Sequence, residues 1–150
     1  MNTVTLSFVA VLMFVLIGSL EAVATVPLQR LRGVKTGDHF YTTSVAEAMA
    51  AAGSKAYVSE GVATRVSTST TSECSLIPVY RYFNNRNDHF YTNNQAEGNG
   101  AAGYVSEGIA FYCAANENDC GATQAFYRYY FNSEHFYTTN VQEGFNVVGA

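Results

Sequence analysis

The four residues His-Phe-Tyr-Thr occur three times in this chain, at His39–Thr42, His89–Thr92 and His135–Thr138. Each copy lies in a longer shared frame. An Arg precedes the His by seven to nine residues, a Glu follows the Tyr by six residues, and a Gly follows that Glu by six more. The His-to-His steps of 50 and 46 residues are typical of a repeated supersecondary unit. Because one catalytic centre has little use for three copies of a pattern, the repetition favours a scaffold or several similar binding sites.

The frame predicts three units, over about residues 26–66, 77–113 and 125–150. In the second unit, the aromatic and β-branched run Ile77–Phe83, followed by the turn Asn84–Asn87, predicts the start of a β-hairpin that the His-Phe-Tyr-Thr segment completes. A second pair of short strands is expected near the end of the first two units.

A short helix is expected after each hairpin. Ser44, Asn94 and Asn140 each precede a Glu by three residues, which is the pattern of an N-cap residue with a Glu that caps in return. The predicted fold class is mainly β with short helices. Three tandem hairpin–helix–β units would close around a pseudo-threefold axis in a trefoil-like or propeller-like domain.

The first 24 residues have the pattern of a secretory signal peptide. Val4–Leu20 carries no charge, and Ala22-Val23-Ala24 is a small-x-small cleavage pattern. The alternative is an uncleaved membrane anchor, since the apolar stretch is near the lower length limit for a membrane span. Cleavage predicts a secreted, extracellular protein with one domain over residues 25–150 and no membrane attachment.

The third unit lacks the strand signals that follow the helix in the other two. This predicts an exposed sheet edge near the Ala125–Thr139 hairpin and self-association through that unit. The formal net charge of −4 shows no basic footprint, so nucleic acid is not an expected partner.

Three cysteines in an exported chain predict one disulfide with one remaining thiol, or an intermolecular bridge. Cys113 and Cys120 flank one short linker, so they are the expected pair. Cys74 is then the expected free thiol.

The chain resembles the secreted HFYT-repeat family, a tandem repeat domain of unknown function found in extracellular bacterial and fungal proteins, often in three copies. The resemblance is carried by three segments of the first unit and by their counterparts in the second: Pro27–Leu31, Asp38–Thr42 and Tyr57–Ala63, with Pro78–Tyr82, Asp88–Thr92 and Tyr104–Ala110. The chain departs from the family pattern at Gln29, at Glu134 and in the shorter third copy. The resemblance implies a carbohydrate- or surface-binding module and transfers no catalytic residue.

The repeated charged residues have structural as well as functional interpretations. Three His around one axis are a possible zinc site, but each can hydrogen-bond to the neighbouring acid of its own unit, so no metal or cofactor is expected. The repeated Glu residues, with Glu60 and Glu107, are possible acids of a hydrolase, although capping already explains their position. An Arg within an apolar strand needs a carboxylate, which predicts the ion pairs Arg30–Glu60 and Arg81–Glu107 and leaves Arg128 without a partner.

Tyrosines are the preferred ligand-binding candidates because the ring and hydroxyl suit both stacking and hydrogen bonding. The expected contact residues are Tyr41, Tyr91, Asn93, Asn94, Tyr137 and Asn140. The alternative for each Tyr is a place in the core. The predicted function is non-catalytic recognition of glycan or another extracellular surface ligand, with no catalytic residue. A secreted hydrolase, or an enzyme inhibitor that presents the Ser67–Leu76 loop, are the alternatives.

Overall fold

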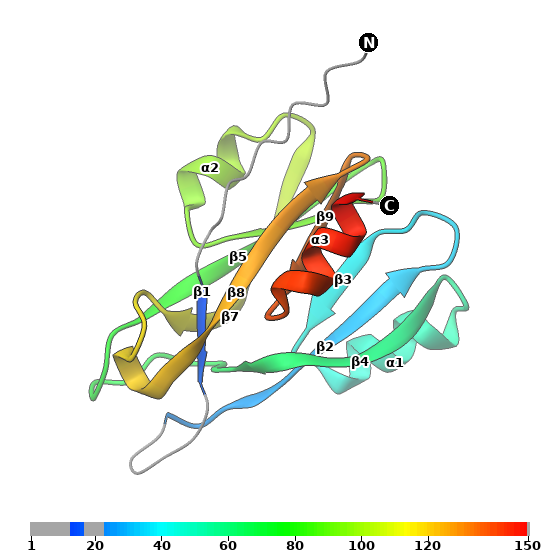
Figure 1. The fold of residues 1–150 in the computed structure, drawn as a ribbon. Helices are drawn as coiled ribbons and strands as arrows, with labels where there is room; N and C mark the ends of the chain where they lie inside the picture. The colour runs from blue at the N-terminus through cyan, green and yellow to red at the C-terminus, as the bar shows by residue number, and fades with distance from the viewer. Residues whose placement is uncertain (1–12, 17–22, 150) are drawn as a thin grey trace.

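Each His-Phe-Tyr-Thr segment is the returning strand of an antiparallel β-hairpin in the computed structural model, which describes residues 13–16 and 23–149 (Figure 1). The hairpins share one register, in which the Arg of the first strand lies opposite the Tyr of the second. Their strands are β2 (Val26–Gly33) with β3 (His39–Thr42), β5 (Leu76–Asn84) with β6 (His89–Thr92), and β8 (Ala122–Phe131) with β9 (Glu134–Thr138).

A short helix follows each hairpin, as predicted: α1 (Val45–Gly53), α2 (Gln95–Gly100) and α3 (Val141–Gly149). The predicted N-caps are confirmed, since the side chains of Ser44, Asn94 and Asn140 accept hydrogen bonds from backbone amides of the first turn. These bonds satisfy donors that a helix start otherwise leaves open. Figure 1 shows α1 and α2 at opposite sides of the molecule.

One long strand follows α1 and another follows α2, where two short strands were predicted. They are β4 (Tyr57–Val66) and β7 (Tyr104–Ala114). Gly61 and Gly108 lie within them at φ of 91° and 92°, beside irregularities of the pairing register with β2 and β5. A glycine at positive φ inside a strand bends it as a β-bulge, so each pair of predicted strands is one bent strand.

The described strands form two open antiparallel sheets, in the orders β6-β5-β7-β1-β8-β9 and β3-β2-β4. The fold is therefore mainly β with short helices, as predicted. Strand β1 (Met13–Leu16) pairs with β8 through Met13–Phe126 and Leu16–Ala122. Beyond Phe126, β8 pairs only with β9 among the described strands, so β1 covers only the start of the predicted edge near Ala125–Thr139. Most of the predicted signal peptide, residues 1–12 and 17–22, lies outside the described residues. No helix within the described part is long and apolar enough to cross a membrane.

The main core is shared by all three units. Nine buried side chains contribute to it: Leu28, Tyr41, Val66, Val79, Tyr91, Phe111, Cys113, Phe126 and Tyr137. Since each unit supplies only part of this cluster, a single unit cannot bury its own apolar face, which is the usual reason that such units occur together.

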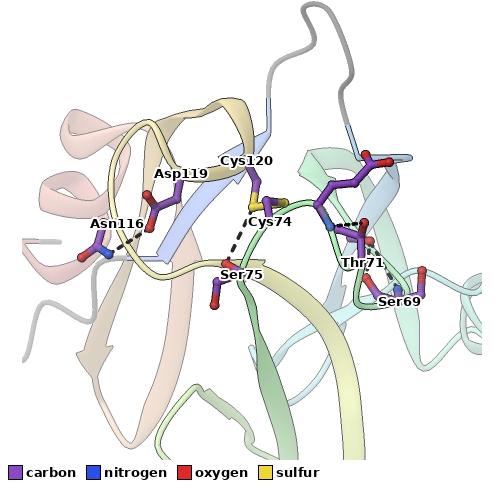
Figure 2. The surroundings of a disulfide bond; sticks show 9 residues. Ser69, Thr71, Cys74, Ser75, Asn116, Asp119 and Cys120 are labelled. Atoms are coloured by element: carbon purple, nitrogen blue, oxygen red, sulfur yellow. Dashed lines mark hydrogen bonds between the residues drawn. A yellow bond between two sulfur atoms is a disulfide. The ribbon is translucent and has the colours of Figure 1, made fainter.

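The predicted Cys113–Cys120 disulfide is wrong, because the bond joins Cys74 to Cys120 (Figure 2). Cys113 is on the inner face of β7 with Phe111 and is 1% exposed, so its thiol points into the core. The two linkers instead meet outside the core, where the Cys120 sulfur also lies 3.7 Å from the carbonyl oxygen of Ser75. Strand alternation, rather than sequence distance, decided which cysteines could meet.

We expect the Cys113 thiol to be unreactive in the folded protein. Burial raises its pKa to about 12, so almost no thiolate forms at neutral pH. A thiol reagent should label nothing under native conditions and one thiol per chain after unfolding without reductant. Rapid native labelling, or a peptide map that joins Cys113 to Cys120, would contradict the pairing.

Candidate functional site

The tyrosines of the three His-Phe-Tyr-Thr segments lie in the centre of the core and are 0–1% exposed. Each hydroxyl makes two hydrogen bonds to the backbone of another unit, and the bonds run in a closed cycle. Tyr41 Oη donates to the Tyr137 carbonyl at 2.7 Å and accepts from the Tyr137 amide at 2.9 Å. Tyr137 Oη makes the same two bonds to the carbonyl and amide of Tyr91. Tyr91 Oη makes them to the carbonyl and amide of Tyr41, and these four bonds measure 2.7–2.8 Å. We call these three residues the tyrosine cycle.

The tyrosine cycle excludes these residues as ligand contacts, so that part of the prediction is wrong. The rings meet edge to face at centroid distances of 5.4–5.5 Å, and both the ring and the hydroxyl are used inside the protein. Burial also raises the pKa of the Tyr41 hydroxyl well above its ordinary value. The predicted Asn94 and Asn140 are exposed but serve as N-caps, while Asn93 is partly buried.

The predicted ion pairs Arg30–Glu60 and Arg81–Glu107 are confirmed, at 2.9 Å and 2.7 Å. A second set of pairs, which the sequence did not predict, links neighbouring units. Both terminal nitrogens of Arg30 donate to Glu143, those of Arg81 donate to Glu47, and those of Arg128 donate to Glu97, at 2.8–3.2 Å. Arg128 therefore has a carboxylate partner after all, and Glu97 is its only ion-pair partner among the described residues.

The sequence predicted that each repeated Glu caps its own helix in return. The structure shows a different role for these residues. Each carboxylate accepts a hydrogen bond from the Thr of its own His-Phe-Tyr-Thr segment and two from an Arg of another unit. Burial raises the pKa of Glu47 and Glu97, but the hydrogen bonds from Arg and Thr outweigh it and the pKa of each is lowered. A general acid needs the opposite shift.

His89 and His135 pair with acids of another unit rather than with the acid beside them. His39 Nε2 lies 3.5 Å from Glu60 Oε2 of its own unit. Asp38 accepts from the backbone amide and Nδ1 of His89, at 2.8 and 2.6 Å. Asp88 accepts from the same two groups of His135, at 2.9 and 2.7 Å. The Tyr57 and Tyr104 hydroxyls complete these two sites by donating to Asp38 and Asp88. Asp38 and Asp88, the acids that precede the first two His, therefore join the units.

The third acid, Glu134, breaks this pattern. His39 Nδ1 and Glu134 Oε2 are buried atoms without a hydrogen-bond partner among the described residues. Carboxylate oxygens of Asp38, Asp88 and Glu134 lie within 4.8 Å of one another, and such oxygens are ligands for hard cations. The two aspartates, however, already accept three hydrogen bonds each from protein donors. Burial, then Asp88 and Asp38, raise the pKa of Glu134 to about 8, so the proton on Glu134 reduces the repulsion in this cluster.

Glu134→Gln is expected to flatten the dependence of stability on pH. The folded state holds the Glu134 proton up to about pH 8, whereas the unfolded carboxyl loses it near 4.5. This contribution to stability is thus complete below pH 4.5 and is lost as the pH rises to about 8. A difference of one bound proton between the folded and unfolded states changes the free energy of unfolding by about 1.4 kcal/mol per pH unit. Partial solvent exposure of Glu134 makes the effect smaller. Urea unfolding at several pH values measures it.

Glu134→Asp is the matched control, since it keeps the carboxyl group and shortens the side chain to that of Asp38 and Asp88. It should give His39 Nδ1 the carboxylate partner that Nδ1 has in the other two histidines. The His39 pKa, now lowered mainly by burial, should then rise in an NMR titration. An unchanged pH dependence in Glu134→Gln would mean that Glu134 is ionised in the fold.

A cavity of about 510 Å³ lies at the junction of the first and second units. Its walls are the β2–β3 turn, the segment between α1 and β4, and one residue of the next hairpin turn: Lys35, Thr36, Ser54, Lys55, Ala56, Tyr57 and Asn87. We call it the first junction cavity. Its lining is polar except for Ala56 and the Tyr57 ring, and nothing in it is needed for the tyrosine cycle.

A second cavity, of about 380 Å³, lies at the equivalent junction of the second and third units. It is lined by the β5–β6 turn, by the segment before β7 and by the third hairpin: Asn84, Asn85, Arg86, Ala102, Gly103, Tyr104, Tyr130 and Ser133. We call it the second junction cavity. Tyr104 is in the position that Tyr57 has in the first cavity, and Tyr130 is 55% exposed.

Sequence reasoning missed both junction cavities because their residues come from turns that differ between the units. The one shared signal was the Tyr at the start of the last strand, Tyr57 and Tyr104, which the predicted strands already contained. The repeated residues are mostly used to hold the units together. The variable turn residues remain available to a ligand.

Comparison with known proteins gives a family but no activity. Residues 27–150 match the family model described as Domain of unknown function (DUF5648). No curated protein and no solved structure matches the chain. The match covers the three hairpins, the three helices and both junction cavities, and the chain therefore belongs to the DUF5648 family.

Proposed function

We propose that the protein is a secreted, non-catalytic binding module that recognises carbohydrate or another extracellular surface ligand. The two junction cavities are the observation that carries this proposal. Their volumes, about 510 and 380 Å³, suit a small ligand or one residue of a polymer. Each combines a Tyr ring with hydroxyl, amide or cationic groups. A sugar offers the complementary surface, with apolar ring faces and many hydroxyls.

A non-catalytic role is supported by the state of the carboxylates. Glu47, Glu97 and Glu143 are held by Arg and Thr, and the pKa of each is lowered, which is unsuitable for the acid of a carboxylate pair. Glu134 has the raised pKa that such an acid needs, but it lines neither junction cavity. The Ser67–Leu76 loop of the inhibitor alternative lines neither junction cavity.

The cyclic contacts of the tyrosines and of the Arg–Glu pairs support a pseudo-threefold arrangement, either trefoil-like or propeller-like. Equivalent junctions of such an arrangement would present similar cavities at fixed spacing. Two weak sites on one rigid body bind a repetitive ligand more tightly than either site alone.

Secretion is supported by the Cys74–Cys120 disulfide, because such bonds persist mainly in oxidising compartments. Signal cleavage after Ala24 would remove β1 and leave residues 122–126 of β8 without that partner strand. An unpaired edge of this kind favours self-association through the third unit. Sedimentation of the exported protein tests this, and a monomer at all concentrations would contradict it.

Binding to a glycan array tests the proposed function directly. Wild-type protein should bind a subset of immobilised glycans. Tyr130→Ala should weaken that binding by about tenfold, the order of one good aromatic contact. Phe145→Ala is the matched control, since Phe145 is 47% exposed on α3 and lines neither junction cavity.

Two results would contradict the proposal. One is the absence of binding to any glycan or cell-surface preparation. The other is equal binding by wild type and Tyr130→Ala together with loss in Phe145→Ala, which would place the ligand on another surface.

A further inference from the structure

The first junction cavity contains both lysines of the chain. Lys35 is in the β2–β3 turn and Lys55 is in the turn after α1, and both are exposed. The other cations are mostly committed elsewhere: Arg30, Arg81 and Arg128 join the units, Arg32 pairs with Glu60 and Arg65 bonds to Thr25. Among the described residues, neither Lys35 nor Lys55 has a carboxylate within ion-pair distance, and no acidic residue lines the cavity.

The remaining polar groups of the cavity also offer donors. The Thr36 hydroxyl accepts from the Asp38 amide, which leaves its own hydrogen available to a ligand. The Asn87 side-chain amide has no hydrogen-bond partner among the described residues. Ser54, in contrast, is used internally, because its hydroxyl donates to the Ala51 carbonyl and accepts from the Ala56 amide. The residues that line this space therefore bring two ammonium groups, a hydroxyl and an amide to it.

The walls that carry these donors are fixed by the backbone. The Val34 amide donates to the Ala56 carbonyl at 2.9 Å and joins the two turns that bear the lysines. The β2–β3 turn is closed by Gly37 donating to Gly33, and the Lys55 amide donates to Ala52. Lys55 has a φ of 60°, a left-handed conformation that sets the direction of its side chain. Fixed walls reduce the entropy lost when a ligand binds.

We infer that the first junction cavity binds the anionic group of an acidic saccharide, a carboxylate or a sulfate, and this inference rests on the proposed function. Anion binding in a chain of net charge −4 requires a local site, and this cavity concentrates two cations with no acid in its lining. Oxygen atoms of the anion would accept from the ammonium groups, and sugar hydroxyls would meet Thr36, Asn87 and the Tyr57 ring.

The second junction cavity has a different lining and a different expected preference. It has one cation, Arg86, and two tyrosines, Tyr104 and Tyr130. Stacking and uncharged hydrogen bonds should dominate there. The two cavities would thus hold different parts of one glycan chain, with the acidic residue in the first.

Calorimetric titration of the full chain with oligogalacturonate, and with its methyl ester as the uncharged match, tests the inference. Lys35→Gln/Lys55→Gln should bind oligogalacturonate at least about tenfold more weakly than wild type, given the strength of charge-assisted hydrogen bonds. The methyl ester should bind wild type about as weakly as oligogalacturonate binds the Lys35→Gln/Lys55→Gln variant. A sulfated oligosaccharide is the second ligand. Comparing its affinity with that of oligogalacturonate shows whether the cavity prefers a sulfate or a carboxylate.

Two double variants serve as controls. Arg32→Gln/Arg65→Gln removes the same charge at exposed positions outside both junction cavities, and Lys35→Arg/Lys55→Arg keeps the charge inside the first. Each should change the affinity by less than about twofold, because the first leaves both cavity lysines in place and the second keeps their charge.

The inference is overturned if the ester binds as tightly as the acid, or if both Gln double variants lose affinity equally; saccharide binding, and with it the proposed function, would then still stand. If none of these saccharides binds, the inference fails, and the glycan array decides separately whether the proposed function stands. Binding of inorganic sulfate as tight as that of the sulfated oligosaccharide would retain an anion site and reject a saccharide ligand.

Discussion

Tyr91→Phe is expected to lower the free energy of unfolding by about 2–5 kcal/mol, since a buried group that loses its hydrogen-bond partner costs roughly 1–3 kcal/mol. The change removes one oxygen and leaves two backbone groups unpaired. These are the Tyr41 amide, which donates to Tyr91 Oη, and the Tyr41 carbonyl, which accepts from it. Both lie in the core, where Tyr41 and Tyr91 are each 1% exposed.

Chemical denaturation followed by fluorescence or circular dichroism measures this loss. Tyr41→Phe and Tyr137→Phe should have similar effects, because each hydroxyl has the same two backbone partners in the tyrosine cycle. Tyr130→Phe is the control, as Tyr130 is 55% exposed and outside the cycle. If Tyr91→Phe cost no more than Tyr130→Phe, the cycle would not stabilise the fold.

Glu97→Gln is expected to destabilise the protein by about 2 kcal/mol, below the range for a fully buried ion pair because the Glu97 side chain is 33% exposed. Arg128 is 8% exposed and donates two hydrogen bonds to Glu97 at 2.8 and 3.1 Å. No second carboxylate pairs with Arg128 among the described residues, so the guanidinium would be left without a counter-charge.

The chain supplies its own controls for this prediction. Glu47→Gln and Glu143→Gln remove the equivalent carboxylates, but Arg81 keeps Glu107 and Arg30 keeps Glu60. Both should cost clearly less than Glu97→Gln in the same unfolding experiment. Equal losses of stability in all three variants would show that Glu107 and Glu60 do not compensate for the removed carboxylate.

Low pH should weaken the ion pair between Glu97 and Arg128. Burial opposes ionisation of Glu97, but the Arg128 and Thr92 hydrogen bonds prevail and lower its pKa. A group with a lowered folded-state pKa stabilises the fold above its ordinary pKa, here 4.5, and the contribution is lost as the pH falls through the folded-state value. Wild type should therefore lose stability below about pH 4.5 more steeply than Glu97→Gln does.

Much of the local structure could be predicted from the sequence. The hairpins, the helix starts at Ser44, Asn94 and Asn140, and the pairs Arg30–Glu60 and Arg81–Glu107 depend on residues of one unit at fixed spacing. The error over Cys113 has a physical cause. The prediction paired Cys113 with Cys120 because they are close in the sequence. Cys113 lies on the inward face of β7, so its thiol is buried and Cys120 pairs with Cys74.

The candidate site could not be predicted in the same way. The junction cavities form where turns of two units meet, and neither turn alone indicates a cavity. Lys35 and Lys55 are 20 positions apart in the sequence, and their common environment depends on the backbone bond between Val34 and Ala56.

The sequence by itself determined that the protein contains three copies of one hairpin-and-helix pattern, because local hydrogen bonding and side-chain alternation act within a few residues. Only the tertiary structure decided what the repeated residues do. Tyr41, Tyr91 and Tyr137 bond to one another's backbones, and each repeated Glu takes an Arg from another unit. Such contacts span 31 to 113 positions of the chain and arise only when the units pack, since burial leaves each polar group to find its partner across the junction.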